Sequence, residues 1–327
     1  THDSARDIRV SVASALAQVG VTTELIVVDN ASSDSTLEIL REFSGQVRLF
    51  AMDRNTGFAV GMNTGIEAST GRYVLALNPD CRLEPDFCAV LAERLDEVHS
   101  AGSASGRLYR GSGPTLVRTD TLDSTGMYFT ASGRHFDRGA GEPATGSYME
   151  EGPVFGVTGA AGFYRRAALD AVRISTGYFD EDFFVYREDA DLAWRLSHAG
   201  WTCLYVPGAE AVHRRANLPE RRSRMSAAIN YHSVKNRWLL RINNQTAREF
   251  LATAIPTLAR DAVVIAACLV RERSSIAAFP WLWRNRHRLV AKRREIQALS
   301  RKYATAAQGR DGADMLVQEH PRKESTD

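Results

Sequence analysis

The chain has 327 residues, of which 44% are hydrophobic and 24% are charged. These values exclude a disordered or fibrous protein and fit one large globular domain or two smaller ones. The four cysteines form no Cys-x-x-Cys pair and no His/Cys cluster at zinc spacing, so we expect neither a disulfide framework nor a structural zinc site. With no signal peptide at the start, the sequence predicts a reducing, cytoplasmic location.

Charge is distributed unevenly along the chain, although the formal net charge is only +2. Residues 1–213 contain 18 Lys and Arg against 29 Asp and Glu (net −11), and residues 214–302 contain 20 against 5 (net +15). Residues 303–327 contain 3 against 5 (net −2). An acidic body followed by a basic third indicates chemistry with cations or carboxylates in the first part and contact with an anionic surface in the second.

The first hundred residues alternate between helical and strand patterns. Ile8, Val12 and Leu16 follow helical spacing, and residues 25–28 form a continuous apolar run that is typical of a buried strand. Further helices are predicted at 33–43, 57–69 and 86–98, and further strands at 47–52 and 73–77. This alternation predicts an α/β fold with a Rossmann-like, mostly parallel sheet flanked by helices.

The first predicted helix has no strand before it, although a doubly wound sheet needs one there. The chain also begins at Thr1 rather than at Met. We therefore expect the first strand of the sheet to be missing from this sequence and to lie upstream of residue 1.

After residue 98 the pattern changes to Gly-, Ser- and Thr-rich segments, which predict loops and hairpins. Helices are predicted at 165–172 and 188–198, and a strand at 201–206 that closes at Pro207 and Gly208. A second short strand, 210–212, is predicted to end at His213. We expect three parts: an α/β domain at 1–244, a basic helical extension at 245–304 and a disordered tail at 305–327.

Two polar segments follow the early strands. Asp29 ends the strand at 25–28 and can accept a hydrogen bond from a nucleobase or ribose, whereas residues 32–35 can simply cap the next helix. Three glycines at four-residue spacing, Gly57, Gly61 and Gly65, leave one helical face bare. That face suits either close approach of an anionic ligand or tight packing on the sheet, and the sequence leaves both open.

Two later segments carry candidate metal and acid-base residues. Asn78 and Asp80 flank a proline, and two such oxygen ligands fit a divalent cation bound to a diphosphate, although Asn-Pro is also an ordinary turn. Six carboxylates fall within residues 180–191. Glu188 and Asp189 begin a predicted helix there. Crowding among the carboxylates raises a pKa and the helix N-terminus lowers it, so the pattern predicts either a general base or a stabilising acidic first turn.

In this order, the segments resemble glycosyltransferase family 2, the inverting transferases of the GT-A fold, and most closely its bacterial rhamnosyltransferase-like branch. The resemblance covers about residues 1–240. It rests on Val28-Asp29-Asn30 with Ser32 and Asp34, residues 54–65, Asn78-Pro79-Asp80, residues 159–162, Phe179-Asp180-Glu181 with Phe184, residues 188–192 with Arg195, and Gly200-Trp201 followed by His213. The ordered set is specific, whereas no single motif is.

The resemblance implies a role for each matching residue. Asp189 is similar to the catalytic base, with Glu188 beside it. Asp80 looks like the metal-binding Asp of an Asp-x-Asp motif whose first position is Asn78, and His213 like the second ligand for Mg²⁺ or Mn²⁺. The implied nucleotide-sugar contacts are Thr1, Asp3, Asp29, Asn55, Gly57, Asn63 and Asn78. Arg195 is expected to be structural and to pair with an acidic neighbour.

The implied activity is inverting transfer of a sugar from a nucleotide diphosphate donor, with dTDP-rhamnose favoured. The acceptor is a hydroxyl of a glycan or a lipid-linked molecule in cell-envelope polysaccharide synthesis. Two alternatives stay open. One is a non-catalytic nucleotide-sugar binder or membrane-associated scaffold. The other is a sugar nucleotidyltransferase, whose expected Gly-rich triphosphate loop is not visible near the start.

The basic third raises the question of membranes. The apolar run at 262–270 is only nine residues long, too short to cross a bilayer, so we expect no transmembrane helix. Trp281 and Trp283 precede a cluster of arginines, which is typical of a segment on an anionic leaflet and predicts peripheral attachment to the inner face of the plasma membrane. The alternative is a helical subdomain packed on the catalytic domain, with a homodimer interface as one form of it. Nucleic-acid binding is not expected, since no recognisable module accompanies the charge.

Overall fold

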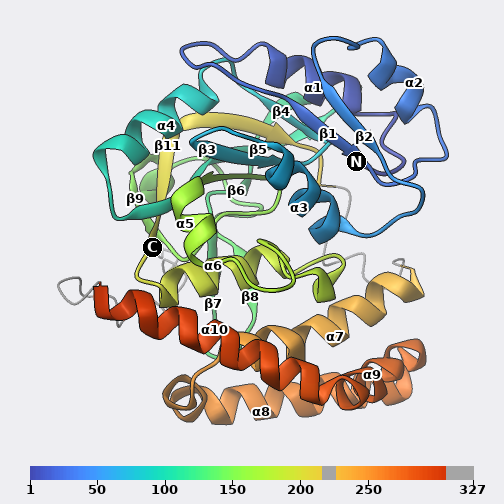
Figure 1. The fold of residues 1–327 in the computed structure, drawn as a ribbon, viewed down its shortest axis with the longest axis vertical. Coiled ribbons are helices and arrows are strands. Elements are labelled where there is room, and N and C mark those ends of the chain that lie inside the picture. The colour runs from blue at the N-terminus through green and yellow to red at the C-terminus, as the bar shows by residue number, and fades with distance from the viewer. Residues whose placement is uncertain (216–225, 307–327) are drawn as a thin grey trace, which may run out of the picture.

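A computed structural model describes residues 1–215 and 226–306 (Figure 1). The elements up to β11 form an α/β body with a seven-stranded sheet and two two-stranded sheets, β1-β2 and β7-β8, in the described residues. The C-terminal helices form a layer along one side of this body. The predicted tail at 305–327 lies almost wholly outside the described residues.

The elements up to residue 98 match the predicted alternation of helix and strand. They are α1 (Ile8–Leu16), β1 (Ile26–Asp29), α2 (Thr36–Arg41), β2 (Arg48–Ala51), α3 (Phe58–Ala68), β3 (Tyr73–Leu77), β4 (Cys81–Leu83) and α4 (Phe87–Glu97). Only β4 was not predicted, because three residues are too few to show a period.

The second half of the body contains more strands than the sequence pattern predicts. Its elements are β5 (Ala101–Ser112), β6 (Val117–Ser124), β7 (Met127–Phe129), β8 (His135–Asp137), η1 (Gly146–Met149), β9 (Gly152–Val154), β10 (Ala161–Arg165), α5 (Arg166–Ala171), η2 (Glu181–Phe183), α6 (Glu188–His198) and β11 (Thr202–His213). The helical layer consists of α7 (Ala227–Asn244), α8 (Ala247–Val270), η4 (Arg273–Ala277), α9 (Ala278–Arg284) and α10 (Arg286–Ala306).

The large sheet has the strand order β3-β10-β5-β11-β4, with β6 added on β5 and β9 on β11. The α/β class and the flanking helices are as predicted, but the pairing directions differ. Within this sheet β5 and β11 are parallel, whereas β10 pairs antiparallel with both β3 and β5, and β4 antiparallel with β11. The long region between α4 and α5 supplies strands without crossover helices, and antiparallel neighbours need none.

The prediction that Pro207 and Gly208 close a strand is wrong. β11 continues to His213, and its register against β5 shifts between Val206 and Glu210. Residues 207–209 therefore form a bulge, where a proline need not donate to the ladder. The extension of the strand brings His213 opposite Cys81 of β4.

Two apolar clusters cover the opposite faces of the large sheet. Phe163 and Tyr164 are consecutive on β10 and so point to opposite faces. Phe163 packs with the buried face of α4, including Leu91, whereas Tyr164 packs with α5 and α6, including Leu192. All four cysteines are buried and free.

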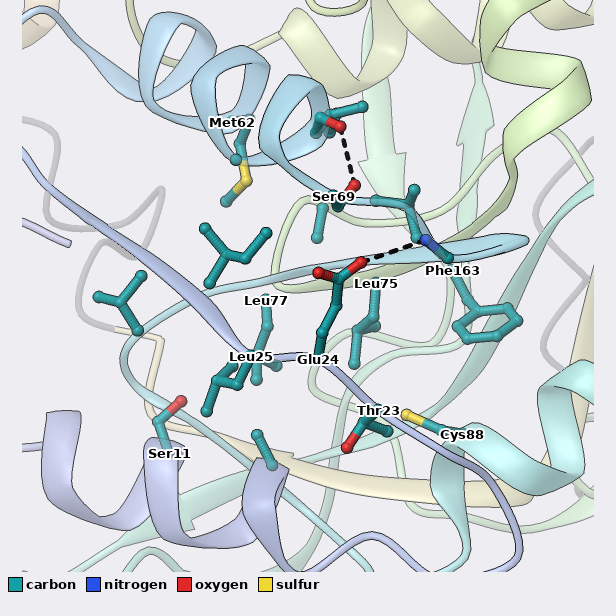
Figure 2. A pocket seen from close by; sticks show the side chains of 18 of the residues that line it. Ser11, Thr23, Glu24, Leu25, Met62, Ser69, Leu75, Leu77, Cys88 and Phe163 are labelled. Carbon is teal, nitrogen blue, oxygen red and sulfur yellow. Dashed lines mark hydrogen bonds between the residues drawn. The ribbon is translucent and has the colours of Figure 1, made fainter. Parts of the chain in front are cut away.

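A gap separates the two-stranded β1-β2 sheet from the large sheet. β1 pairs only with β2 among the described strands, and β3 lies at the edge of the large sheet. A cavity of about 460 Å³ lies between them, lined mainly by aliphatic residues of α1, β1, α3 and β3 (Figure 2). The Thr1 ammonium donates to the Val28 carbonyl (2.6 Å) and the Asn30 amide donates to the Thr1 carbonyl (2.8 Å). Thr1 thus makes a parallel ladder contact on the open edge of β1. The missing strand remains a prediction, and the aliphatic cavity beside this edge is the place where we expect such a strand to fit.

The domain boundary predicted at residue 244 coincides with the end of α7. However, α7 packs on α9, α10 and η4 as well as on α6 and η2, so it belongs to the helical layer as much as to the body. The division into two domains remains a prediction.

The sequence predicted no helix long and apolar enough to span a membrane, and the structure contains one. α8 has 24 residues and is, among the described residues, the one helix long and apolar enough for that by length and composition. Counting only the uninterrupted apolar run at 262–270 missed the apolar residues on the earlier turns of the same helix.

Adding a strand should test the gap between β1 and β3. We expect a five-residue extension of β-branched residues before Thr1 to raise the Tm by several degrees, because two or three buried aliphatic side chains contribute roughly 1.5–3 kcal/mol each. A Gly-Ser extension of the same length is the control. Equal Tm values for the two extended chains, measured by calorimetry, would contradict this interpretation of the cavity.

Candidate active site

The loop before α6 has an unusual backbone. Phe184, Tyr186 and Arg187 have positive φ angles of 65°, 66° and 75°, a region that non-glycine residues rarely adopt. Gly57, at the start of α3, packs against this loop: a Cβ at this glycine would lie 2.6 Å from the Phe184 carbonyl oxygen. Strained backbone of this kind persists only where the surrounding structure fixes it.

Asn236 of α7 holds this loop in place. Its buried amide nitrogen lies within hydrogen-bonding distance of the carbonyls of Phe183 (2.9 Å), Val185 (2.8 Å) and Tyr186 (2.8 Å). One side chain of the helical layer therefore fixes the turn that leads into Glu188 and Asp189.

The Asp189 carboxylate lies at the first turn of α6 and is held by backbone amides. The Gly159 amide donates to Oδ2 (3.0 Å) and the Ala190 amide to Oδ1 (2.8 Å). Burial raises the pKa of Asp189 to about 6, and the nearby charge of Asp137 acts in the same direction against these hydrogen bonds. A carboxylate with this pKa is ionised at neutral pH yet able to accept a proton, as a general base must be.

Glu188 lies beside Asp189 in a more apolar environment. Its side chain is buried, and its Oε2 has no hydrogen-bond partner among the described residues. Burial and the charge of Asp189 raise the pKa of Glu188 well above its usual range. Within this pair, Asp189 is the carboxylate that ionises more readily.

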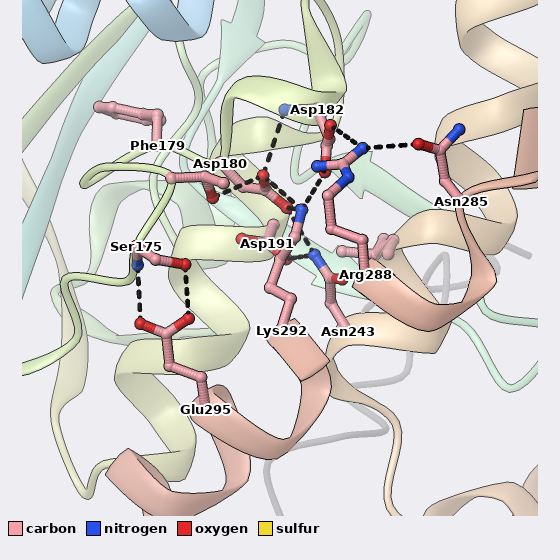
Figure 3. Close-up of polar contacts among 12 residues, drawn as sticks. Ser175, Phe179, Asp180, Asp182, Asp191, Asn243, Asn285, Arg288, Lys292 and Glu295 are labelled. Atoms are coloured by element: carbon pink, nitrogen blue, oxygen red, sulfur yellow. Dashed lines mark hydrogen bonds and ion pairs between the residues drawn. The ribbon is translucent and has the colours of Figure 1, made fainter. Parts of the chain in front are cut away.

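Cations of α10 neutralise two of the remaining carboxylates of residues 180–191, Asp180 and Asp182. The Lys292 ammonium of α10 donates to both oxygens of Asp180 (2.7 and 2.6 Å) and also pairs with Asp182 (Figure 3). Asn243 of α7 donates to Asp180 (2.8 Å) and to Asp191 (3.0 Å). Lys292 and Asp180 are both buried, so the helical layer supplies the counter-charge of the body.

The prediction that Arg195 is structural is confirmed. Its guanidinium is almost fully buried, pairs with Asp191 at 2.8 Å and donates to the carbonyls of Val172 (2.7 Å) and Tyr178 (2.6 Å). In contrast, no ion pair reaches Glu188 or Asp189 within the part of the chain that the structure describes.

Asp80 and His213 meet at the sheet edge, as the resemblance implies. His213 Nε2 lies 3.3 Å from Asp80 Oδ1, and His213 Nδ1 lies 2.7 Å from Asp123 Oδ2. Burial alone would lower the pKa of His213, but the hydrogen bonds to Asp123 and Asp80 outweigh it and raise that pKa to about 10. Asp123 is fully buried and orients the imidazole.

Two chains of contacts connect this pair to Asp189. In the first, the backbone amide of Asn78, two residues before Asp80, donates to the carbonyl of Ala160 (2.9 Å). The residue before Ala160 is Gly159, whose backbone amide donates to Asp189. In the second, Arg215 pairs with both Asp123 and Asp137, and the charge of Asp137 acts on Asp189. Intermediate residues thus link the predicted base to the predicted metal ligands, and the roles of all three side chains remain predictions.

A divalent cation bound by Asp80 and His213 would displace the Nε2 proton that the raised pKa of His213 otherwise retains. Cis ligands of an octahedral Mg²⁺ or Mn²⁺ lie about 3 Å apart, close to the 3.3 Å between the two atoms. Asp123 contacts the other imidazole nitrogen and orients the ring, as a carboxylate commonly does for a metal-binding histidine. No group of three His, Cys, Asp or Glu side chains suited to a metal occurs in residues 1–215 and 226–306, so two protein ligands would need oxygens from a diphosphate to complete the shell.

Three of the predicted nucleotide contacts lie together at the end of β1. The Asp29 carboxylate is buried and accepts hydrogen bonds from the Ser32 amide (3.0 Å) and hydroxyl (2.5 Å). Asp3 is exposed and accepts from the Ser33 amide (2.7 Å), and Thr1 lies on the edge of β1. Their proximity is compatible with a base pocket, and their roles remain predictions.

Two of the other predicted nucleotide contacts, Asn63 and Gly57, are engaged in packing. The Asn63 amide is 4% exposed and exchanges two hydrogen bonds of 2.9 Å with the backbone of Phe179. Asn55 is exposed and accepts from the amide of Gly57 (2.9 Å). For Asn63 and Gly57 the geometry favours a packing function, so their placement adds no support for contact with a nucleotide sugar.

Several residues of the cluster were not singled out from the sequence: Asp123, Asp137, Arg215, Asn236 and Lys292. Each acts across a large separation in the chain, for example 90 residues from Asp123 to His213. The weak signal available was the density of acidic residues at 180–191, which requires cations from elsewhere in the fold.

Comparison with known proteins identifies the family. The glycosyl transferase family 2 model matches residues 1–173, which is more than half of the chain, and the protein belongs to this family. N-acetylglucosaminyl-diphospho-decaprenol L-rhamnosyltransferase of Mycobacterium tuberculosis is 28% identical over 243 residues, which cover 67% of this chain and 76% of that protein. Succinoglycan biosynthesis protein ExoO of Rhizobium meliloti is 41% identical over 96 residues, 29% of this chain and 28% of that protein.

Solved structures confirm the fold as that of GT-A glycosyltransferases. The mannosyltransferase PcManGT from Pyrobaculum calidifontis, in complex with GDP-Man and Mn²⁺, has a TM-score of 0.51 and 16% identity, covering 93% of this chain and 85% of that chain. S. aureus TarS has a TM-score of 0.53 and 17% identity, covering 94% of this chain and 54% of that chain. The sequence prediction of a family 2 member with this fold is confirmed.

Asp189→Asn should separate activity from stability. We expect sugar transfer to fall by roughly 10²–10⁴-fold, because the general base is lost. The free energy of unfolding at pH 8 should rise by roughly 1–2 kcal/mol. Because the pKa of Asp189 is higher in the folded state, its ionised form destabilises the native state. This destabilisation is complete above about pH 6 and is absent below about pH 4, where Asp189 is protonated in both the folded and the unfolded chain.

Donor turnover and urea denaturation at pH 8 and pH 4 measure these effects, with the exposed Asp120→Asn as the matched control. The acidic limb of the wild-type kcat/KM profile should lie near pH 6. Near-normal turnover of Asp189→Asn would exclude this residue as the base.

Lys292→Met should be strongly destabilising. It leaves Asp180 buried without its cation, and breaking one partner of a buried pair costs roughly 3–5 kcal/mol. Arg294→Met removes an exposed cation two residues further along α10 and should change stability little. Equal unfolding free energies of the two variants in urea would contradict the proposed importance of the buried pair.

Proposed function

We propose that this protein is an inverting, metal-dependent sugar transferase with Asp189 as its general base. The observation that carries the proposal is the cluster at the sheet edge. A carboxylate whose pKa is raised to about 6 is connected, through Gly159 and Asn78 and through Arg215, to the Asp80–His213 pair.

The chemistry follows from the two ends of this cluster. Asp189 accepts the proton of an acceptor hydroxyl, and the oxygen of that hydroxyl bonds to the anomeric carbon of the donor sugar. The bond between that carbon and the diphosphate oxygen breaks on the opposite face, so the anomeric configuration inverts. A Mg²⁺ or Mn²⁺ held by Asp80 and His213 would stabilise the negative charge of the departing diphosphate. Asp123 holds the His213 imidazole in the orientation that this requires.

The donor we propose is a nucleotide diphosphate sugar, with dTDP-rhamnose favoured. The name of the mycobacterial relative describes rhamnosyl transfer and a decaprenol-linked diphosphate, and solved relatives contain UDP or GDP-Man with Mn²⁺. These names support a lipid-linked or glycan acceptor and a function in cell-envelope polysaccharide synthesis. Such a protein would act in the cytoplasm, at the inner face of the plasma membrane.

Nucleotide binding should depend on the metal and on Asp80. We expect Mn²⁺ to strengthen dTDP binding, and Asp80→Asn to weaken the Mn²⁺-dependent binding at least about tenfold, because a charged ligand is lost. Calorimetric titration of dTDP and UDP with and without Mn²⁺ measures this, and the exposed Glu93→Gln on α4 is the control.

The outcomes distinguish the candidate functions. Binding followed by turnover of dTDP-rhamnose supports the transferase. Metal-dependent binding with no turnover of any donor supports the non-catalytic alternative. Binding that is indifferent to both Mn²⁺ and Asp80→Asn would overturn the assigned metal site.

A further inference from the structure

α8 exposes apolar side chains to solvent and turns acidic side chains toward the protein, the opposite of an ordinary surface helix of a soluble protein. Fifteen of its 24 residues are exposed, and Arg248 is the only charged one among them. The large apolar side chains that face solvent are Phe250 (39% exposed), Leu251 (75%), Ile255 (84%), Leu258 (56%), Val263 (56%), Ile265 (40%), Leu269 (58%) and Val270 (74%). Leu251, Ile255, Leu258, Ile265 and Leu269 recur at helical spacing and form one stripe. An apolar stripe of this length on a water-facing surface indicates a binding surface.

The two acidic residues of the same helix, Glu249 and Asp261, point toward the protein. Asp261 is buried and accepts hydrogen bonds from Arg237 (2.8 Å) and Arg241 (2.6 Å) of α7. Near the start of the helix, Glu249 pairs with His198 of α6 at 2.9 Å and closes a capping box with Thr246. The polar face of α8 is thus fixed by polar contacts at two separate positions.

These contacts hold α8 flat along the surface of the protein. The inward contacts run from Glu249 to the buried Cys268, a distance of about 28 Å at 1.5 Å per residue. To stand upright in a bilayer the helix would have to break the buried Asp261 pairs and expose their charges to hydrocarbon. The helix has the length of a membrane span, but its contacts favour an orientation parallel to the membrane plane.

Cations lie at both ends of the stripe. Arg248 is exposed at the beginning of α8, and Arg271 and Arg273 are exposed directly after its end. An apolar stripe bounded by arginines matches the boundary between headgroups and acyl chains of an anionic leaflet. A purely apolar partner, such as the same stripe on a second copy, would bring these like charges together instead.

We propose that α8 is an in-plane membrane anchor, which inserts the stripe Leu251–Ile255–Leu258–Ile265–Leu269 into one leaflet of an anionic bilayer while Arg248, Arg271 and Arg273 contact lipid phosphates. This deepens the proposed function, because a lipid-linked acceptor is presented at such a surface. It also differs from the sequence prediction, which placed the contact at residues 276–294. In that segment Lys292 is buried, Arg288 pairs with Asp182, and Arg293 donates to the carbonyls of Ile242 and Gln245.

Co-sedimentation of the full chain with vesicles tests the proposal. We expect binding to vesicles of phosphatidylcholine with 30% phosphatidylglycerol, weaker binding to pure phosphatidylcholine, and at least a tenfold loss of affinity for the double variant Ile255→Gln/Leu258→Gln. The matched control, Val19→Gln/Val117→Gln, replaces two valines of similar exposure on the α/β body and should bind as the wild type. Calorimetric dTDP binding without vesicles should be the same in all three chains, so failure of the anchor is distinguishable from failure of the nucleotide site.

Depth measurements test the orientation. With shallowly brominated lipids, the additional quenching in Leu258→Trp and Leu269→Trp should be alike for an in-plane helix, whereas a spanning helix would place position 258 deeper. Unequal quenching of that kind would overturn the in-plane orientation. No vesicle binding, together with a dimer in sedimentation velocity that the double variant converts to a monomer, would assign the stripe to a second copy and overturn the membrane proposal.

Discussion

The contact between Lys292 and the Asp180–Asp182 pair is the interaction on which the candidate site depends. Six carboxylates in residues 180–191 cannot be packed into the body unless cations neutralise part of their charge. α10 inserts one buried ammonium between Asp180 and Asp182, and α7 adds the amides of Asn243 and Asn244, which donate to Asp191 at 3.0 and 2.7 Å. The helical layer is therefore part of the structure of the site rather than an appendage.

The unequal distribution of these cations gives the site its chemistry. Asp180, Asp182 and Asp191 are paired with Lys292 or Arg195, whereas Glu188 and Asp189 have no ion pair within the described residues. Burial then raises the pKa of both, and two backbone amides moderate the effect at Asp189. Two adjacent carboxylates with different proton affinities thus arise from where the fold supplies cations and where it does not.

The sequence predicted local features well and contacts between distant segments poorly. Helix and strand periods gave β3 and α6 with their observed bounds, and the family resemblance gave the pairing of Asp80 with His213. The continuation of β11 beyond Pro207 was missed because proline and glycine signal a turn more often than a bulge. Contacts such as Lys292 with Asp180, 112 residues apart, leave no local pattern. The buried carboxylates require a cation, but the sequence does not show which later helix supplies it.

Net charge alone does not show which cations of the basic third are exposed and which are paired inside the fold. Many of its cations are internal: Arg237 and Arg241 neutralise Asp261, and Lys292 neutralises Asp180. Part of the excess of +15 over residues 214–302 therefore pairs with acids of the body, as Arg288 and Lys292 do with Asp182 and Asp180, and does not face an anionic surface. Exposure of apolar side chains discriminates better, because nothing within the described fold compensates for leaving Leu251 and Ile255 in water. The buried pairs of Arg237 and Arg241 with Asp261 also hold α8 with its apolar face outward, so the internal arginines and the exposed stripe belong to one structural arrangement.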